Sequence, residues 1–340
     1  MRARAGAFVE PIDAYDVELL PEIEGIAEGA GVDAEDVLAI NLRTEIMFGL
    51  GGRSAPGGLR ECTALCSTGG GVGWHAPVLA QNWDWKPAVR EHCVVLAAAP
   101  HGRPGFVTVV EAGLLAKCGV NEAGLALATN ALISTLDRGA PGVPYHAVLR
   151  RILTSSSVDE AIAAVRVGPR ASSANYLIAD DAGRAVDLEA VPGGPSEVRA
   201  FEGQALGHAN HFLWPAPRPF KDVGRIDGED SVRRQARVDG SLGEIAGSSD
   251  PSPDARGERI RAALADHDGR PSSVCAHEDP TVPPIEDFVT VISMIAEPAS
   301  RILWVTDGNP CERPYERLDV ADLLDRAGRA LSGPARSGTP

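Results

Sequence analysis

The sequence has no long apolar run. Its first twenty residues, MRARAGAFVEPIDAYDVELL, contain two arginines but no apolar core of the length that a signal peptide needs. No later stretch approaches the roughly 20 consecutive apolar residues of a membrane-spanning helix. We therefore expect a cytoplasmic protein that has no membrane partner.

Positive charge is scarce as well. The 340 residues include 32 lysines and arginines against 47 aspartates and glutamates, a formal net charge of -15. A surface of this sign repels the phosphate backbone of nucleic acids and anionic lipid headgroups. We therefore expect no nucleic-acid partner. Apolar residues make up 44% of the chain, which is enough to bury a sizeable core in one large domain or two ordinary ones.

Cysteines are few and scattered, and a disulfide framework is not expected in a chain without an export signal. Only Cys62 and Cys66 lie close together, spaced C-x3-C. No second pair of cysteines or histidines at ligand spacing follows nearby, so we expect no metal site. The six cysteines are Cys62, Cys66, Cys93, Cys118, Cys275 and Cys311.

The chain before the first cysteine is expected to be helical. Apolar residues recur at helical spacing over 15–29, and Asp33 is a suitable N-cap for a second helix that runs through Met47. Residues 49–60, GLGGRSAPGGLR, then break the periodicity with five glycines and a proline. They predict an exposed loop that ends at Glu61 and Cys62.

After Cys62 the pattern changes to short apolar or alternating runs separated by glycine and proline. The short connections predict antiparallel pairing, and the first three runs are expected in one sheet. Because helices and strands come in blocks, the fold class is α+β, with surface helices over 222–284. The expected strands are 78–85, 93–99, 106–111, 114–118, 125–128, 176–179, 185–189, 288–295 and 301–305, and helices are expected over 145–153 and 158–165.

Cys62 is placed for self-cleavage. Glycines tolerate the strained backbone that an N-to-S acyl shift requires, so the Cys62 thiol can attack the carbonyl of Glu61. Hydrolysis of the resulting thioester would free the α-amine of Cys62. An α-amine has a pKa of about 7.7–8.0 and a thiol one of about 8.5, so the amine can serve as the general base of its own residue.

Several short motifs, taken in order, resemble one family, the acyl-coenzyme A:6-aminopenicillanic acid acyltransferases, which are also called isopenicillin N acyltransferases. Members of this family are N-terminal-nucleophile cysteine hydrolases. The resemblance implies a four-layer αββα sandwich with antiparallel sheets. The motifs are CT (62–63), QNWDW (81–85), GVNEAGL (119–125), NYLIAD (175–180), HANH (208–211) and TDGNPC (306–311).

The resemblance also implies a processed enzyme. Self-cleavage would yield a small subunit, residues 1–61, that stays associated with a core of residues 62–327. Apart from the resemblance, residues 328–340 are expected to be a flexible tail, as chain termini commonly are. The substrate would be a small amide or an acyl thioester. Acyl-coenzyme A is a candidate co-substrate, and no other cofactor is implied.

Individual roles follow from the same resemblance. Cys62 matches the nucleophile, Asp84 the carboxylate that orients the α-amine and thiol, and Asn175 the oxyanion donor. The sequence departs from the family pattern at two places. The residue before the nucleophile is Glu61, where the fungal enzyme has glycine. Residues 69–75 lengthen the loop after the nucleophile. Ser231 and Arg234 resemble the family's serine and arginine near the site, and the further residues expected to bind substrate are Asn82, Trp83, Asn121 and His211.

Other interpretations remain open from the sequence. Asn121 suits the left-handed position of a turn as well as a binding role. An uncut chain could pair Cys62 with His208 or His211 as a thiol protease does. A third possibility is an inactive binding protein with the same fold. For Asp84, a functional role is favoured over a charge at a strand edge or in a turn, because a carboxylate between two tryptophans on a core strand needs a partner.

Overall fold

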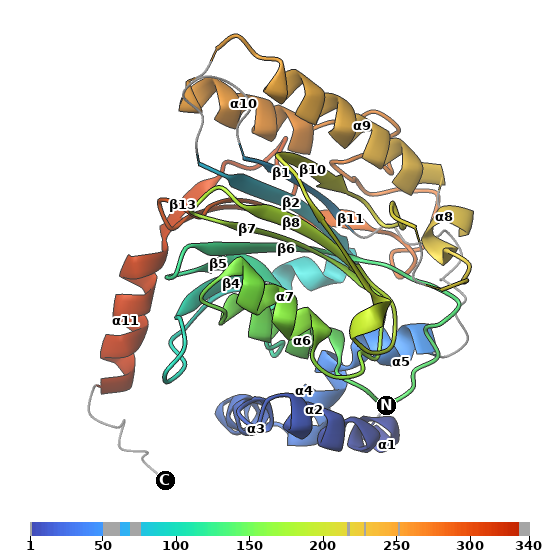
Figure 1. Ribbon diagram of the computed structural model, residues 1–340, viewed down its shortest axis with the longest axis vertical. Coiled ribbons are helices and arrows are strands. Elements are labelled where there is room, and N and C mark those ends of the chain that lie inside the picture. Colours follow the sequence, from blue (N-terminus) through green and yellow to red (C-terminus); the bar gives the residue numbers. More distant parts are fainter. Residues whose placement is uncertain are drawn as a thin grey trace.

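The computed structural model describes residues 2–49, 62–68, 76–215, 218–227, 229–250 and 252–332. Their chain forms two stacked antiparallel sheets with helices on both outer sides (Figure 1), which confirms the expected α+β sandwich. Glu61, most of the glycine-rich loop 49–60 and the longer loop 69–75 lie outside the described residues. Within those residues, no helix combines the length and the apolar character that crossing a membrane requires.

The first sheet carries Cys62 at the start of one of its strands. Among the described residues it has six strands, all paired antiparallel. In spatial order they are β10 (Ala205–His208), β1 (Cys62–Ser67), β2 (Val78–Trp85), β11 (Val289–Glu297), β12 (Ile302–Asp307) and β13 (Glu316–Asp319).

The second sheet follows the order of the chain, since each strand pairs with the next one. It contains seven strands within the described ranges. They are β3 (Cys93–Ala98), β4 (Phe106–Glu111), β5 (Cys118–Asn121), β6 (Leu125–Ala131), β7 (Ala174–Asp180), β8 (Ala185–Ala190) and β9 (Val198–Glu202).

The helices form an N-terminal group, a pair between β6 and β7, and a set that follows β10. The N-terminal group is α1 (Arg2–Ala5), α2 (Val9–Tyr15), α3 (Leu19–Ala30), α4 (Ala34–Asn41) and α5 (Arg43–Gly49). The others are α6 (Tyr145–Leu153), α7 (Val158–Arg166), α8 (Val223–Asp227), α9 (Glu229–Ala246), α10 (Pro253–Leu264) and α11 (Val320–Ser332), with short 3-10 helices over Gly6–Phe8, Pro87–His92 and Pro195–Glu197.

Apolar side chains on alternate strand positions bind the layers together. On β1, Leu65 faces α9 and α10 and packs with Leu242 and Ile260. Its neighbours Ala64 and Cys66 face the second sheet instead. Side chains alternate between the two faces of a strand, so a strand buried on both faces shows a continuous apolar run.

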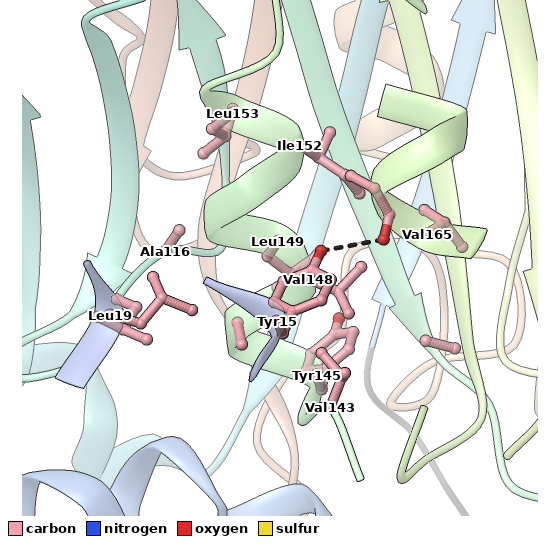
Figure 2. Packing of buried hydrophobic residues seen from close by; sticks show 14 of the residues in the cluster. Tyr15, Leu19, Ala116, Val143, Tyr145, Val148, Leu149, Ile152, Leu153 and Val165 are labelled. Atoms are coloured by element: carbon pink, nitrogen blue, oxygen red, sulfur yellow. Dashed lines mark hydrogen bonds between the residues drawn. The ribbon is translucent and has the colours of Figure 1, made fainter. Parts of the chain in front are cut away.

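The N-terminal helices pack on the outer side of the second sheet, together with α6 and α7. Leu19 of α3 and Leu149 of α6 belong to the same buried cluster (Figure 2). The hydroxyl of Tyr15 also donates a hydrogen bond of 3.0 Å to the carbonyl of Ala164 in α7. The segment before Cys62 therefore shares one core with the rest of the chain.

Most expected elements are present, and the differences have local causes. Residues 114–117 are not a strand, because the Leu115 N–H donates to the side chain of Asn41 (2.9 Å) rather than to a neighbouring strand. The first three expected strands do not share a sheet, since β2 pairs with β1 and β11 while β3 and β4 lie in the other sheet.

The C-terminal helix also differs from expectation. We expected fraying from Gly328, but α11 continues to Ser332. Leu324 anchors this helix in the core between the sheets, and no proline interrupts residues 320–332, so the helix continues past Gly328. Residues 333–340 lie outside the described part of the chain.

Replacing Leu149 with alanine tests the core that joins the N-terminal helices to α6. Leu149 is fully buried, so the truncation should lower the free energy of unfolding by about 2–5 kcal/mol. Val167→Ala, at an exposed position, should change it by less than about 0.5 kcal/mol. Chemical denaturation of both variants measures the difference, and equal effects would contradict the packing described.

Candidate active site

Strand β2 distributes its polar and aromatic residues between two faces. Trp83 and Trp85 belong to the core between the sheets, and Gln81 points the same way. The Gln81 amide donates to the backbone carbonyl of Thr129 on β6 and accepts from the Thr129 N–H at 3.2 Å. This pair of hydrogen bonds joins the two sheets beside the candidate nucleophile.

Cys62 lies directly opposite Trp83 in the antiparallel register of β1 and β2. Both side chains are about 1% exposed and lie in the core between the sheets. The thiol of Cys62 therefore faces the second sheet. A substrate carbonyl would have to reach it from that side.

A buried arginine and an asparagine hold the backbone of Cys62. The Cys62 N–H donates to Oδ1 of Asn210 at 3.0 Å. Arg234 of α9 donates from Nη1 to the Cys62 carbonyl (2.6 Å) and to Oγ1 of Thr63 (2.8 Å). Its Nη2 donates to the same Oδ1 of Asn210 at 2.9 Å, and Asp230 lies 3.7 Å from that nitrogen.

The orientation of the Asn210 amide follows from its partners. Its Oδ1 faces two donors, Cys62 N–H and Arg234, while its Nδ2 donates to the carbonyl of Ala131 at 3.0 Å. A flipped amide would set donor against donor. Gly224 of α8 packs directly on the Asn210 backbone, because a Cβ at this position would lie 1.9 Å from the Asn210 carbonyl oxygen.

Ser231 and His211 support Asn210 from behind. The Asn210 N–H donates to Oγ of Ser231 at 2.8 Å, and the same Oγ lies 2.8 Å from Nδ1 of His211. Burial, reinforced by nearby positive charge, lowers the pKa of His211 to about 4. The ring is therefore neutral, and its Nδ1 shares a hydrogen bond with the serine hydroxyl. Cys62, His211, Ser231 and Arg234, all expected at the site, thus meet through Asn210.

Asp84 lies beside this group but points to the other face of the sheet. It follows Trp83, the residue opposite Cys62, and it pairs with Thr290 of β11. Oγ1 of Thr290 donates to Oδ1 of Asp84 at 2.6 Å, and the Ala276 N–H donates to that Oγ1 at 2.9 Å. The Asp84 carboxylate thus lies on the face of the sheet opposite to the Cys62 thiol.

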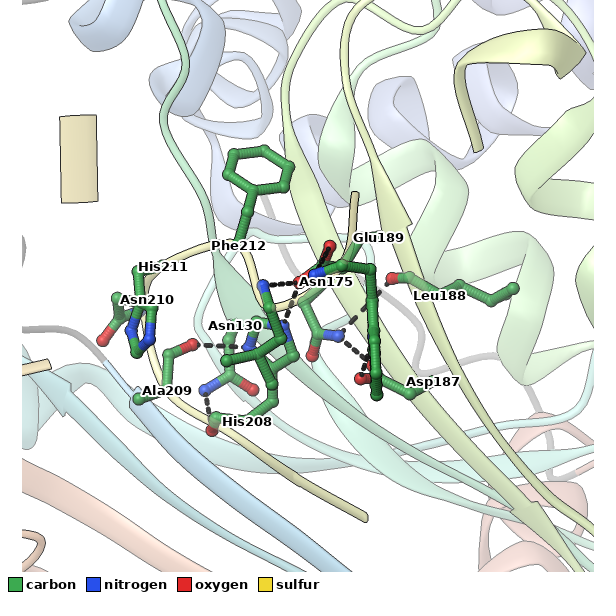
Figure 3. A network of polar contacts seen from close by, with 12 residues as sticks. Asn130, Asn175, Asp187, Leu188, Glu189, His208, Ala209, Asn210, His211 and Phe212 are labelled. Carbon is green, nitrogen blue, oxygen red and sulfur yellow. Dashed lines mark hydrogen bonds and ion pairs between the residues drawn. The ribbon is translucent and has the colours of Figure 1, made fainter. Parts of the chain in front are cut away.

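Asn175 belongs to a buried polar network between the sheets (Figure 3). Its Nδ2 donates to Asp187 and, at 3.4 Å, to the carbonyl of Leu188. It pairs across β6 and β7 with Asn130, whose Nδ2 donates to the His208 carbonyl at 2.9 Å. Among the described residues, neither amide oxygen has a hydrogen-bond partner.

His208 carries a positive charge in this network. Its Nε2 lies 2.8 Å from Glu189 and its Nδ1 lies 2.8 Å from the Ala209 carbonyl, so both nitrogens face acceptors. Burial opposes this charge, but Asp187 and the hydrogen bond to Glu189 outweigh it and raise the pKa of His208 to about 9. Burial also raises the pKa of Asp187 to about 6.

Two residues expected to bind substrate hold backbone groups elsewhere. Asn82 faces α10, where its Nδ2 donates to the carbonyls of Leu264 (2.7 Å) and Val274 (2.8 Å). Asn121 donates to the carbonyls of Leu153 and Ser155 at the end of α6. The structure therefore does not bring these two side chains to the thiol face of β1.

A small cavity adjoins Trp83. Its volume of about 20 Å³ is enough for about one water molecule. Helix α5 contributes part of its wall, so residues before Cys62 cover it. His146 donates from Nδ1 to the Ala116 carbonyl (2.9 Å), which leaves Nε2 as a buried acceptor without a partner among the described residues. The lining residues are Arg43, Thr44, Met47, Trp83, Trp85, Lys117, Ala131, Tyr145 and His146.

The sequence matches one protein family over most of its length. Residues 73–312 fit the family model of acyl-coenzyme A:6-aminopenicillanic acid acyl-transferase. The chain belongs to this family. The matched range includes Asp84, Asn210 and Arg234 and begins after Cys62.

A curated relative within the acyltransferase family is the 40 kDa form of the acyl-coenzyme A:6-aminopenicillanic-acid-acyltransferase of Emericella nidulans. It is 31% identical over 256 residues, which cover 75% of this chain and 66% of the fungal protein. The chain therefore spans just under two thirds of the length of that relative.

Two solved structures share the fold. Penicillin V acylase from Agrobacterium tumefaciens has a TM-score of 0.50 at 15% identity and covers 78% of this chain and 89% of its own. A mutant form of conjugated bile acid hydrolase from Clostridium perfringens has a TM-score of 0.51 at 12% identity, over 77% and 94%. These likenesses confirm the N-terminal-nucleophile hydrolase sandwich and concern the fold alone.

Asn210 was not among the site residues expected from the sequence, although it contacts Cys62. It lies within the HANH motif, which carried part of the resemblance. That motif was a usable signal, because an asparagine between two histidines at the end of a short strand is a candidate polar anchor. What the motif could not show is that Asn210 hydrogen-bonds to Cys62, because the pairing of β10 with β1 brings the two residues together.

The charge of His208 predicts a pH dependence of stability. Its pKa is raised on folding from about 6.5 to about 9, so its stabilising contribution is complete below pH 6.5 and is lost as the pH rises through 9. The unfolding midpoint of the native protein should therefore fall across this window more steeply than that of His208→Gln. Thermal unfolding between pH 6 and 10 measures both slopes.

His101→Gln is the matched control for that experiment. His101 is exposed on the turn between β3 and β4, so the variant should keep the slope of the native protein. Equal slopes in all three proteins would contradict a charged His208.

Proposed function

We propose that the chain is a self-processing cysteine amidohydrolase or acyltransferase with Cys62 as its nucleophile. The observation that carries this proposal is the hydrogen bond from the Cys62 N–H to Asn210, fixed by Arg234. In an ordinary strand this N–H would pair with another strand. Here the Cys62 nitrogen, which would become the catalytic α-amine, instead donates to the side-chain oxygen of Asn210.

Self-cleavage would begin with the Cys62 thiol. Its sulfur attacks the carbonyl carbon of Glu61, the peptide C–N bond breaks, and the Cys62 nitrogen takes up the thiol proton. Water then hydrolyses the thioester, which gives the Glu61 carboxylate and restores the thiol. Arg234 holds the Cys62 carbonyl at 2.6 Å throughout, so the new N-terminus stays in place.

Turnover would use the freed amine as the base. The α-amine accepts the thiol proton, the thiolate attacks the substrate carbonyl, and the leaving amine departs with a proton from the α-ammonium. The acyl group then passes from sulfur to water or to an acceptor amine. Asn210 would hold the amine, and we assign Asp84, fixed by Thr290, as the carboxylate that orients it.

The two histidines support this mechanism over a thiol protease pair. Both nitrogens of His208 face acceptors, so its ring is already protonated and cannot take a proton from a thiol. Nδ1 of His211 is hydrogen-bonded to Ser231, which in turn accepts from the Asn210 N–H. We assign both rings to the architecture around Cys62.

The contacts favour Asn210 over Asn175 as the asparagine that acts at Cys62. Asn175 donates from its Nδ2 to Asp187 and to the Leu188 carbonyl. Asn210 contacts the nucleophile residue directly. We therefore place Asn175 in the supporting network instead of assigning it to the oxyanion.

The substrate class follows from the family and from the cavity beside Trp83. The relatives described above are named for acyl transfer between acyl-coenzyme A and 6-aminopenicillanic acid, for penicillin V and for conjugated bile acids. We propose a small amide or acyl thioester whose acyl group rests on Trp83, Trp85 and Tyr145. Since α5 covers this cavity, binding requires α5 to shift.

Mass spectrometry of the purified protein tests self-processing. We expect one fragment of residues 1–61 and one chain that begins with Cys62, held together in native separation because both share a buried core. Cys62→Ala should stay intact, whereas Cys93→Ala, which changes a half-buried cysteine elsewhere, should process normally. An intact native chain with full activity would rule out this mechanism.

Alkylation by iodoacetamide at pH 7 tests the role of Asn210 without a known substrate. Cys62 of the processed protein should react fastest of the six cysteines, since its amine activates the thiol. Asn210→Ala should slow this reaction by about 10²-fold, because misplacing a catalytic group by about 1 Å costs that much. Asn175→Ala should change the rate by less than about threefold. The reverse order would contradict the assignment of Asn210 to the Cys62 amine.

A further inference from the structure

Two histidines and two cysteines from separate segments meet on the outer side of the first sheet. His267 follows α10, Cys275 and His277 lie in the loop before β11, and Cys311 follows β12. One potential ligand atom from each lies within 4.8 Å of the other three. Cys275 and His277 are buried, while His267 and Cys311 close the cluster from the surface.

The distances within this cluster fit a tetrahedral metal site. Zinc bonds of about 2.3 Å to sulfur and about 2.0 Å to nitrogen put tetrahedral ligands about 3.8 Å (S–S), 3.3 Å (N–N) and 3.5 Å (S–N) apart. The Sγ atoms of Cys275 and Cys311 are 3.5 Å apart, and the Nε2 atoms of His267 and His277 are 3.1 Å apart. Nε2 of His277 lies 3.5 Å and 3.4 Å from the two sulfurs.

The residues around the cluster resemble the outer shell of a metal site. Asn309 directs its Nδ2 to the sulfur of Cys275 at 3.4 Å, and Arg90 holds the other end of that amide at 3.1 Å. The carboxylate of Glu312 lies 3.6 Å from Nδ1 of His277. A carboxylate behind a ligating histidine and an N–H directed at a thiolate are common outer-shell arrangements.

We propose that His267, Cys275, His277 and Cys311 bind a structural Zn²⁺ ion. Two thiolates balance the charge of the cation, and the mixed sulfur and nitrogen donors suit zinc better than calcium or magnesium. Four protein ligands leave no open position for substrate or water, which is the arrangement of structural rather than catalytic zinc sites. Neither the family match nor the proposed mechanism requires this ion.

The ion would fix the loop that supports Asp84. Between the ligands Cys275 and His277, the Ala276 N–H donates to Thr290, which in turn donates to Asp84. The Val274 carbonyl, one residue before Cys275, accepts from Asn82. The metal site and the candidate active site thus meet at one short loop.

Elemental analysis of the full chain, purified without added metal or chelator, tests the proposal. We expect about one zinc per chain, by the four-ligand count. Cobalt exchanged into the same protein should show the absorption of tetrahedral cobalt with thiolate charge-transfer bands. This second measurement needs no variant, so it holds even if substitutions at the cluster impair folding.

Two of the four proposed ligands, His267 and Cys311, are exposed, so they can be replaced and compared with control variants of the same residue types elsewhere. Cys311→Ser and His267→Ala change exposed residues and should each lower zinc affinity by more than about 100-fold, since changes in the outer shell alone cost about 10- to 100-fold. Cys93→Ser and His101→Ala, outside the cluster, should keep one zinc per chain. A competing chelator dye measures the affinities.

Three results would overturn the proposal. One is a protein free of zinc that binds added Zn²⁺ no more tightly than the Cys311→Ser variant does. Another is a disulfide between Cys275 and Cys311 in the freshly purified chain, found by peptide mass spectrometry. The third is zinc that remains at full occupancy in both ligand variants, which would place the ion elsewhere.

Discussion

The alternation of side chains along β2 is the constraint on which the rest of the site depends. In the run QNWDW, Gln81 and Trp83 face the second sheet, and Asn82 and Asp84 face the outer helices and the loop before β11. Because side chains on a strand alternate between faces, neighbours in sequence serve different layers. One strand thereby joins the two sheets, lies opposite Cys62, and anchors the loop behind Asp84.

A second constraint is the buried guanidinium of Arg234. It is about 1% exposed, and it donates to the Cys62 carbonyl, to Thr63 and to Asn210. Removing a partner from a buried charge commonly costs about 3–5 kcal/mol, so these contacts specify the position of Cys62 strongly. Ser231, on the same helix, supports Asn210 from the other side. Helix α9 is therefore both the outer layer of the sandwich and the support of the nucleophile.

Much of the architecture could be predicted from the sequence, because strand and helix periodicity are local. The expected elements 106–111 and 145–153 coincide with β4 and α6. The strands β1, β9, β10 and β13 were not among the expected strands. The last three are short and have exposed positions, which carry little periodic signal. Sheet membership of β2 was also missed, because β2 pairs on one side with β11, a strand distant in the chain, while β3 begins the other sheet.

The sequence by itself determined the fold class, the family and the candidate nucleophile Cys62, since each depends on residue types and local order. Only the tertiary structure decided which asparagine contacts Cys62, which histidine is charged, and which cysteines converge. Asn210 is 148 positions from Cys62, and Cys311 is 36 from Cys275. Contacts over such separations are set by strand pairing and layer packing, which no local pattern of residues specifies.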